Sequence, residues 1–208
     1  MKLVVLGANG RTGQLIVETA LARGMDVTAI VRSAQKSLPI DHDRLTIVVG
    51  DPCDPAFLKT VLRGQDALVS ALGARRPTKA GTSVCPRSAA AIVEAALETG
   101  LSRVLVTSTA LLFREQTLLG KILRVIVPNT VRSAARMEEI LAASDLNWTS
   151  ARPGFLTDAH EDAYRAQKDS LPKSGISVSR RALAHFLIDA IEAPDASYAA
   201  FGVSKAAA

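Results

Sequence analysis

The sequence predicts an α/β fold in which one doubly wound parallel sheet carries helices on both faces. Short apolar runs rich in β-branched residues alternate along the whole chain with longer stretches of helical periodicity. These runs lack the polar alternation of a half-exposed strand, which is typical of parallel strands buried on both faces. Right-handed crossovers between such strands give the order 3-2-1-4-5-6, and one further strand trails at the end of the chain.

The first elements form a strand, a glycine turn and a helix. The strand covers residues 3–6, three glycines follow at three-residue spacing, and a helical pattern covers residues 14–23. Such a unit holds a nucleotide pyrophosphate at the helix N-terminus, with Gly7 for the tight turn, Gly10 for close approach and Gly13 for helix packing. The turn therefore predicts a dinucleotide site in a Rossmann-type domain. Its expected cofactor-binding residues are Gly7, Asn9, Gly10, Arg11, Thr12 and Gly13.

The alternation continues through the middle of the chain. Gly24 ends the first helix, and Asp54 is a suitable N-cap for a short helix because Pro55 stands at its first position. Gly100 ends an alanine-rich helix, as Gly24 ends the first one. In chain order, the further predicted elements are strands at 25–31 and 44–49, a helix at 54–62, a strand at 66–72, a helix at 88–99 and a strand at 103–108.

The last third of the chain is less regular. A helix at 133–143 and a strand at 147–151 are followed by Arg152-Pro153-Gly154, which halts the strand. A short apolar stretch at 176–178, a helix at 180–191 and a final strand at 198–203 complete the pattern. Residues 114–128 read as irregular, and the sequence leaves open whether residues 112–130 form a lid.

Length and composition limit the classes of function. A chain of 208 residues without an internal linker or repeat fits one domain over residues 1–208. The net charge of +5 is spread along the chain and aromatic residues make up 4%, which argues against a nucleic-acid surface with stacking platforms. No apolar run reaches a membrane-spanning length and residues 1–6 are too short for a signal peptide, so we expect a cytoplasmic protein without a membrane partner. Cys53 and Cys85 are isolated and predict neither a metal site nor a disulfide framework.

The end of the second predicted strand indicates which cofactor is used. In doubly wound sheets a carboxylate there binds the ribose 2′-hydroxyl of NAD, whereas an arginine accommodates the 2′-phosphate of NADP. Here the strand ends in Arg32-Ser33 without an acidic residue, and a guanidinium can pair a phosphate with two hydrogen bonds. We therefore expect NADP(H) in preference to NAD(H), with Arg32 as the selecting residue and Ser33 beside it. A surface arginine that caps the strand is the alternative.

Other strand ends should contribute to the same cleft. Asp51 follows the third strand, where its carboxylate can accept a hydrogen bond from the adenine amino group, although a simple turn aspartate would look the same. Gly73 follows the fourth strand and lets the cofactor ribose approach the backbone. The remaining expected cofactor-binding residues are Pro52, Leu72, Ala74, Arg75, Thr107 and Pro153.

With these residues in place, the chain resembles the atypical short-chain dehydrogenase/reductases, NAD(P)-binding and NmrA-like, and among them the biliverdin-IXβ reductase/flavin reductase branch. The resemblance runs from residue 1 to about residue 190. It implies NADPH-dependent hydride transfer to a planar conjugated acceptor, FMN, FAD or an open tetrapyrrole. By position, Ser108 matches the serine beside the nicotinamide in these reductases, whereas their histidine after the sixth strand falls on Gly154. The motifs that carry the resemblance are GANGRTG at 7–13, AIVR at 29–32, VGD at 49–51, GQDA at 64–67, LG at 72–73, VTSTA at 106–110, ARPG at 151–154 and VSR at 178–180.

Several side chains remain as candidates for chemistry. Ser108 either holds the nicotinamide and the acceptor or satisfies local backbone. His160 is the candidate proton donor because it follows the sixth strand near the expected mouth of the cleft. Tyr164 and Lys168 have the Tyr-x-x-x-Lys spacing of carbonyl reductases, but they lie beyond the sixth strand and not on the helix before it, so we interpret them as a coincidental surface pair. Residues 111–113 are apolar and either line an acceptor pocket or pack under the following segment.

Two functions from different classes follow. The first is an NADPH-dependent reductase of a planar acceptor, which needs mainly proximity and orientation over the nicotinamide. The second is a non-catalytic NmrA-like sensor whose NADP(H) occupancy controls a partner. A nucleotide-sugar epimerase or dehydratase is disfavoured because the acid is missing and the C-terminal third is short. We expect a monomer, because helices on both faces leave no sheet surface to cover.

Overall fold

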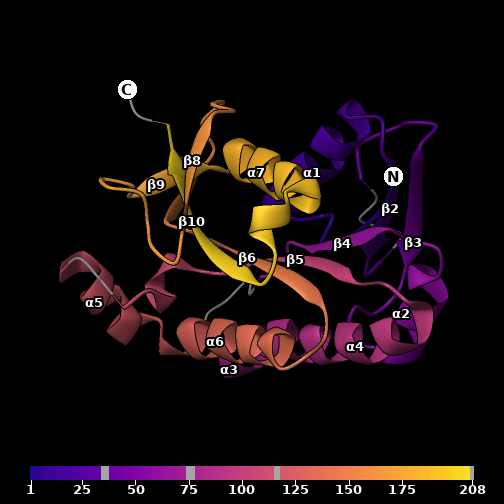
Figure 1. Cartoon of the computed structure of the whole chain (residues 1–208), viewed down its shortest axis with the longest axis horizontal. Coiled ribbons are helices and arrows are strands. Elements are labelled where there is room, and N and C mark those ends of the chain that lie inside the picture. Colours follow the sequence, from indigo (N-terminus) through magenta and orange to yellow (C-terminus); the bar gives the residue numbers. More distant parts are fainter. Residues whose placement is uncertain (34–37, 74–77, 115–117, 207–208) are drawn as a thin grey trace.

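The structure is a computed structural model that describes residues 1–33, 38–73, 78–114 and 118–206. Its main sheet has eight strands in the order β3-β2-β1-β4-β5-β6-β10-β8, so the predicted order 3-2-1-4-5-6 with a trailing strand is confirmed. All neighbouring strands run parallel except β8, which is antiparallel to β10. Helices α1 and α7 cover one face of this sheet and α2, α4 and α6 cover the other (Figure 1).

The strands that the sequence predicts lie close to their predicted bounds, but β6 continues through Arg152 and Pro153, which were expected to halt it, and β7 and β8 were not predicted. A separate two-stranded sheet pairs β7 with β9 in parallel. The strands are β1 Lys2–Leu6, β2 Asp26–Val31, β3 Leu45–Val49, β4 Ala67–Ser70, β5 Arg103–Thr107, β6 Asn147–Pro153, β7 Phe155–Thr157, β8 Tyr164–Lys168, β9 Ser177–Ser179 and β10 Ala199–Lys205.

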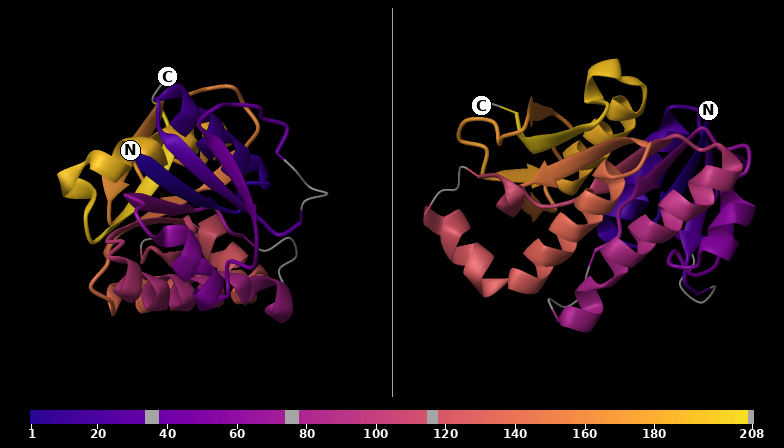
Figure 2. Two further views of the ribbon diagram at one scale, coloured as in Figure 1. Left: turned by 90° about the vertical axis from the view of Figure 1, so that its right-hand side faces the viewer. Right: turned by 60° about the horizontal axis from the view of Figure 1, so that its bottom comes forward.

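The helices are longer and more numerous than the sequence pattern predicts. The α-helices are α1 Arg11–Ala22, α2 Pro55–Leu62, α3 Lys79–Thr82, α4 Val84–Thr99, α5 Leu118–Ile126, α6 Pro128–Ala142 and α7 Arg180–Glu192. Two 3₁₀ turns, η2 Ala110–Leu112 and η3 Pro194–Ala196, complete the regular structure. Two views of the ribbon show the two helical layers with the sheet between them (Figure 2).

The central strands separate two hydrophobic cores. In β1, Leu3 and Val5 pack toward α1 and α7, whereas Val4 and Leu6 pack toward α2, α4 and α6. All four are fully buried, which explains the unbroken apolar run in the sequence. At the edge of the sheet, β3 departs from this expectation, because Ile47 and Val49 are exposed there.

Local signals set several helix ends where the sequence predicts them. The Asp54 side chain accepts a hydrogen bond from the backbone N–H of Ala56 at 2.9 Å, so its predicted N-cap role is confirmed. Gly100 ends α4 in the left-handed conformation, at φ +74°. Ser179 caps α7 by accepting from the N–H of Ala182 at 2.9 Å.

The prediction that residues 114–128 are irregular is wrong, because α5 lies within them. The helix predicted at 133–143 also begins five residues earlier, where Pro128 takes the first position of α6. Within the described parts of the chain, no helix combines the length and apolar character that a membrane crossing requires.

One buried arginine ties the C-terminal helix to the sheet. The Arg103 guanidinium donates to the carbonyl oxygens of Ile191 and Asn147 at 3.0 and 3.1 Å, and also to the carbonyl of Ala190. Burial lowers its pKa to about 10. The cation thereby satisfies backbone carbonyls at the end of α7 that the helix itself leaves without donors.

Candidate functional site

The glycine turn between β1 and α1 is tightly packed. Gly7 has φ +76°, and a Cβ placed there would lie 3.0 Å from the backbone carbonyl of Ala71 in the loop after β4. A Cβ on Gly13 would lie 2.1 Å from the carbonyl oxygen of Gly7, which only a glycine avoids. The N–H of Gly10 closes the turn on that same oxygen at 2.9 Å. The predicted roles of Gly7 in the turn and of Gly13 in packing therefore have direct structural reasons.

The N-terminus of α1 is open to an anion. Gly10 is the N-cap and provides no side-chain acceptor, and the first turn contains no acidic residue. The first amides of a helix have no intrahelical partner and carry a partial positive charge. This terminus can therefore accept a pyrophosphate.

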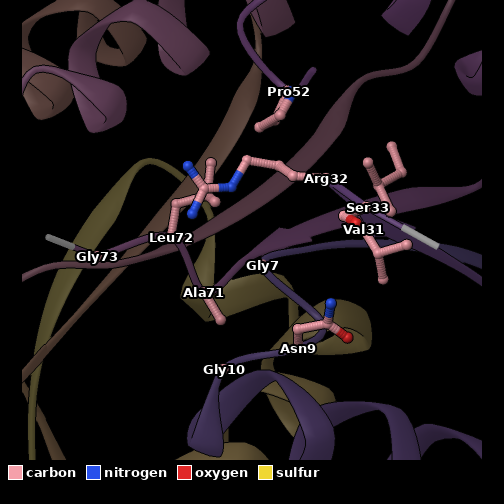
Figure 3. A pocket seen from close by; sticks show the side chains of 11 residues that line it. Gly7, Asn9, Gly10, Val31, Arg32, Ser33, Pro52, Ala71, Leu72 and Gly73 are labelled. Carbon is pink, nitrogen blue, oxygen red and sulfur yellow. The ribbon is translucent and has the colours of Figure 1, made fainter. Parts of the chain in front are cut away.

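Two adjoining cavities open at the carboxyl ends of the strands. The first measures about 350 Å³ and lies between the glycine turn and the ends of β2 and β4. Figure 3 shows the side chain of Arg32 reaching across this cavity toward Leu72 and Pro52. Ser33 also lines it, as the sequence predicts. The full lining is Gly7, Asn9, Gly10, Ile30, Val31, Arg32, Ser33, Pro52, Ala71, Leu72 and Gly73.

The second cavity, of about 400 Å³, continues from the first toward β5, β6 and α6. The two share Gly10, Ala71, Leu72 and Gly73. Its lining combines hydroxyl groups with apolar side chains: Gly10, Arg11, Thr12, Ala71, Leu72, Gly73, Thr82, Cys85, Thr107, Ser108, Thr109, Thr130, Ser133, Ala134, Met137, Pro153, Leu156, Arg180 and Leu183.

Charge in both cavities has one sign. Among the described residues that line them, Arg11, Arg32 and Arg180 are cationic and none is a carboxylate. Asp158 lies between two of these arginines and accepts from Arg11 Nη1 at 2.8 Å and from Arg180 Nη1 at 2.6 Å. Such a lining suits a polyanionic ligand.

Two buried polar atoms in the cavity lining have no hydrogen-bond partner among the described residues. They are Asn9 Oδ1 beside the glycine turn and Ser108 Oγ just after β5. Buried polar atoms almost always have partners, so an unpartnered one in a cavity indicates a missing ligand group. A dinucleotide would supply hydrogen-bonding groups to both positions, and the open helix terminus and the arginines fit its phosphates.

Other predicted cofactor residues have mixed placements. Thr107 and Pro153 line the second cavity, and Thr107 Oγ1 donates to the carbonyl of Ser70 at 3.3 Å. The Asp51 carboxylate is exposed, accepts from the N–H of Cys53 at 2.9 Å in its own turn, and lines neither cavity. Its contact with adenine stays a prediction. Ala74 and Arg75 lie outside the described residues.

The walls of the second cavity are held by a buried ion pair. Glu138 on α6 accepts from Ser150 Oγ at 2.6 Å and from Arg152 Nε at 3.0 Å, and both donors belong to β6. The Arg152 guanidinium also lies 4.8 Å from the centre of the Phe113 ring. Phe113 is 4% exposed and is not among the residues that line the second cavity, which disfavours the pocket-lining alternative for this residue, while its packing under the following segment stays a prediction.

The remaining candidates for chemistry lie apart from the cavities. His160 is exposed and lines neither of them, so the structure does not bring it to Ser108. Tyr164 and Lys168 are the first and last residues of β8, and Tyr164 Oη donates to Asp189 Oδ2 at 2.8 Å. A Cβ on Gly154 would lie 2.2 Å from the carbonyl oxygen of Ile176, which explains why no larger side chain stands there.

Sequence reasoning missed part of the second cavity. Ser133 Oγ donates to the carbonyl of Thr82 at 2.5 Å, which joins α6 to α3. Cys85 lies beside them, and burial raises the pKa of its thiol, so the sulfur stays protonated at neutral pH. Isolated threonines, serines and a cysteine on separate helices give no recognisable spacing, and the only hints were Thr109 in the VTSTA motif and Arg180 in the VSR motif. The missed residues are Thr82, Cys85, Thr109, Thr130, Ser133, Ala134, Met137, Leu156, Arg180 and Leu183.

Residues 7–194 match the model of the NAD(P)H-binding family. The chain is 32% identical over 154 residues to the Photosystem II assembly factor Ycf39 of Guillardia theta, which covers 72% of this chain and 45% of that protein. It therefore spans less than half the length of that relative. It is also 23% identical over 207 residues to the uncharacterized protein YwnB of Bacillus subtilis, which covers 94% of each.

Solved structures share the fold. A short-chain dehydrogenase/reductase from Veillonella parvula, in complex with NADP, has a TM-score of 0.84 at 22% identity and covers 98% of this chain and 94% of that one. A Rossmann-fold NAD(P)-binding family protein from Shigella flexneri has a TM-score of 0.77 at 20% identity, with 98% and 93% covered. At these identities the likeness shows the fold alone.

Proposed function

Because the chain belongs to the NAD(P)H-binding family, we propose that it is an NADPH-dependent reductase that acts on a planar conjugated acceptor such as a flavin. The observation that carries this proposal is the pair of adjoining cavities. Each is lined by at least one arginine and contains a buried polar atom without a partner among the described residues, Asn9 Oδ1 in the first and Ser108 Oγ in the second. The first cavity would hold the adenosine half of NADP(H), and the second the nicotinamide and the acceptor.

The preference for NADP(H) rests on Arg32. Its side chain lines the first cavity and forms no ion pair with another described residue, and none of the described residues that line this cavity is a carboxylate that could bind a ribose 2′-hydroxyl. An arginine can bind a 2′-phosphate with two charge-assisted hydrogen bonds. The open N-terminus of α1 would bind the pyrophosphate, and the side-chain amide of Asn9 would form a hydrogen bond to the cofactor beside it.

Reduced NADP supplies a hydride from its nicotinamide. The chain's own contribution is to bind and orient: Ser108 Oγ would hydrogen-bond the nicotinamide amide or the acceptor, while Pro153 and Met137 exclude water. Among the described residues that line the second cavity there is no tyrosine, lysine, histidine or carboxylate that could act as a general acid. This composition favours an acceptor that carries its own electron sink and takes its proton from solvent, as a flavin does, over a ketone.

The direct test is NADPH consumption by the purified chain with and without FMN, with NADH measured in parallel. We expect FMN-dependent oxidation of NADPH and much slower oxidation of NADH. Arg32→Ala should lower the ratio of NADPH to NADH affinity roughly tenfold or more, because one charge-assisted hydrogen bond contributes about 1.5–3 kcal/mol. Lys173→Ala, an exposed cation outside both cavities, is the matched control and should leave the ratio unchanged. An unchanged affinity ratio in Arg32→Ala would refute the hypothesis that Arg32 selects NADP(H).

A second candidate is a non-catalytic NADP(H)-binding protein that regulates or assembles a partner. The absence of a general acid among the described cavity residues favours this second function, as does the similarity to a protein named as an assembly factor. Tight NADPH binding without turnover on flavins, quinones and biliverdins would support this second function. Size-exclusion chromatography in the same experiments tests our expectation of a monomer.

A further inference from the structure

Helix α5 presents its apolar side to solvent. Three of its residues are exposed although they are aliphatic: Ile122 is 49% exposed, Val125 79% and Ile126 65%. Their spacing of i, i+3 and i+4 places them on one side of the helix. Among the α5 residues whose burial is described, Gly120 is buried and Leu123 is half-buried, so an apolar side of α5 faces solvent while these two residues lie toward the body of the protein.

The position of α5 leaves this side free. The helix lies at one end of the molecule beyond α6, and the elements that it contacts most are η2 and α6 (Figures 1 and 2). None of the α5 residues whose side chains the structure describes lines either cavity. The exposed apolar side is therefore not part of the cofactor or acceptor site.

Two basic residues lie beside the exposed apolar side. Lys121 and Arg124 on α5 are exposed and form no ion pair with another described residue. Residues 116–137 contain four basic residues and no acidic one. The surface made by Lys121, Ile122, Arg124, Val125 and Ile126, the α5 surface, is thus apolar with a basic margin.

These features decide between possible occupants. A second copy of the chain would bring the same lysine and arginine toward each other, and three side chains fall well short of the roughly 800 Å² per partner of a standard interface. A helix that lies on a bilayer inserts a few aliphatic side chains and places its cations among anionic headgroups. We propose that the α5 surface docks the protein peripherally on an anionic lipid bilayer. The expectation of no membrane partner rested on the lack of a spanning segment, which does not bear on such an interfacial helix.

The test is co-sedimentation of the full chain with vesicles. Vesicles of phosphatidylglycerol and phosphatidylcholine in roughly equal parts are compared with vesicles of phosphatidylcholine alone. We expect binding to the mixed vesicles only, with affinity that falls as salt is raised. Lys121→Gln with Arg124→Gln should weaken binding by roughly fivefold per residue, since each juxtamembrane cation contributes about a factor of that size.

The apolar part is tested by Val125→Gln with Ile126→Gln, which should abolish sedimentation. Leu97→Gln is the matched control, because Leu97 on α4 is 78% exposed and lies outside the α5 surface. Unchanged NADPH affinity in every variant shows that the fold and the cofactor site are intact. No sedimentation of the wild-type chain, equal binding by all variants, or a dimer that Val125→Gln with Ile126→Gln converts to a monomer would each overturn the proposal.

Discussion

The two cavities of the cleft are built in different ways. The first is formed mainly by backbone, with glycines at positions 7, 10 and 73 and one cation, Arg32. The second is formed largely by side chains that come from the glycine turn, the loops after β4 and β5, and the elements α3, α4, α6, β5, β6, β7 and α7. A backbone site depends on a few positions without a Cβ, whereas a side-chain site depends on contacts that hold distant elements together. The predictions below test this difference.

The largest effect is expected where the wall of the second cavity is held. Arg152→Leu leaves the buried Glu138 carboxylate without its cation and should destabilise the protein by about 3–5 kcal/mol. Arg136→Leu removes an exposed pair with Glu139 and should leave the unfolding midpoint unchanged in denaturant titrations. Adding Glu138→Gln to Arg152→Leu should recover part of the loss, and no recovery would contradict the ion-pair explanation.

Backbone packing in the first cavity is tested by Gly13→Ala. The added Cβ would meet the Gly7 carbonyl oxygen at 2.1 Å, so we expect a loss of about 2–3 kcal/mol and much weaker NADPH binding. Gly73→Ala is the control, since nothing lies within 4 Å of its Cβ. Gly73→Ala should keep full stability in denaturant titrations and weaken NADPH binding, because the methyl group occupies space beside the cofactor. Equal stability losses in the two variants would contradict the packing argument.

Ser108→Ala separates a ligand-binding hydroxyl from a structural one. Its Oγ is buried without a partner, so removal should not lower the unfolding midpoint, while kcat/KM with FMN should fall roughly tenfold, or about 1.4 kcal/mol. Ser88 Oγ is also buried and unpartnered, but Ser88 lines neither cavity. Ser88→Ala should therefore match Ser108→Ala in stability and match the wild type in turnover. A drop in stability with unchanged kcat/KM for Ser108→Ala would assign the hydroxyl a structural role.

The smallest effect concerns Tyr164, outside both cavities. Tyr164→Phe removes the hydrogen bond to Asp189 and should cost about 1 kcal/mol without changing turnover. Burial, and after it that hydrogen bond, raises the pKa of Tyr164 in the folded protein. The stability that Tyr164 contributes is therefore fully present below pH about 10 and decreases above it, because the tyrosine of the unfolded chain ionises first. The variant should lose stability less steeply than the wild type above that pH. Abolished turnover with intact NADPH binding would show instead that the Tyr164 and Lys168 pair is catalytic.

Most elements of the first half of the molecule could be predicted from the sequence. Strand, glycine turn and helix are adjacent in the chain, so Gly7, Gly10 and Gly13 report a local geometry that the chain must adopt. The strand order followed from alternation and right-handed crossovers. Arg32 was found because it directly follows a recognisable strand.

The second cavity, the burial of Glu138 and the exposed apolar side of α5 could not be predicted from the sequence, because they depend on contacts between elements. Thr82, Ser133 and Arg180 come together through contacts between elements far apart in the chain, and such contacts have no short-range signature. Gly154 is explained only by the approach of Ile176 from another segment. Helical periodicity shows that a helix has an apolar side, but packing against neighbouring elements decides whether that side faces the core or the solvent.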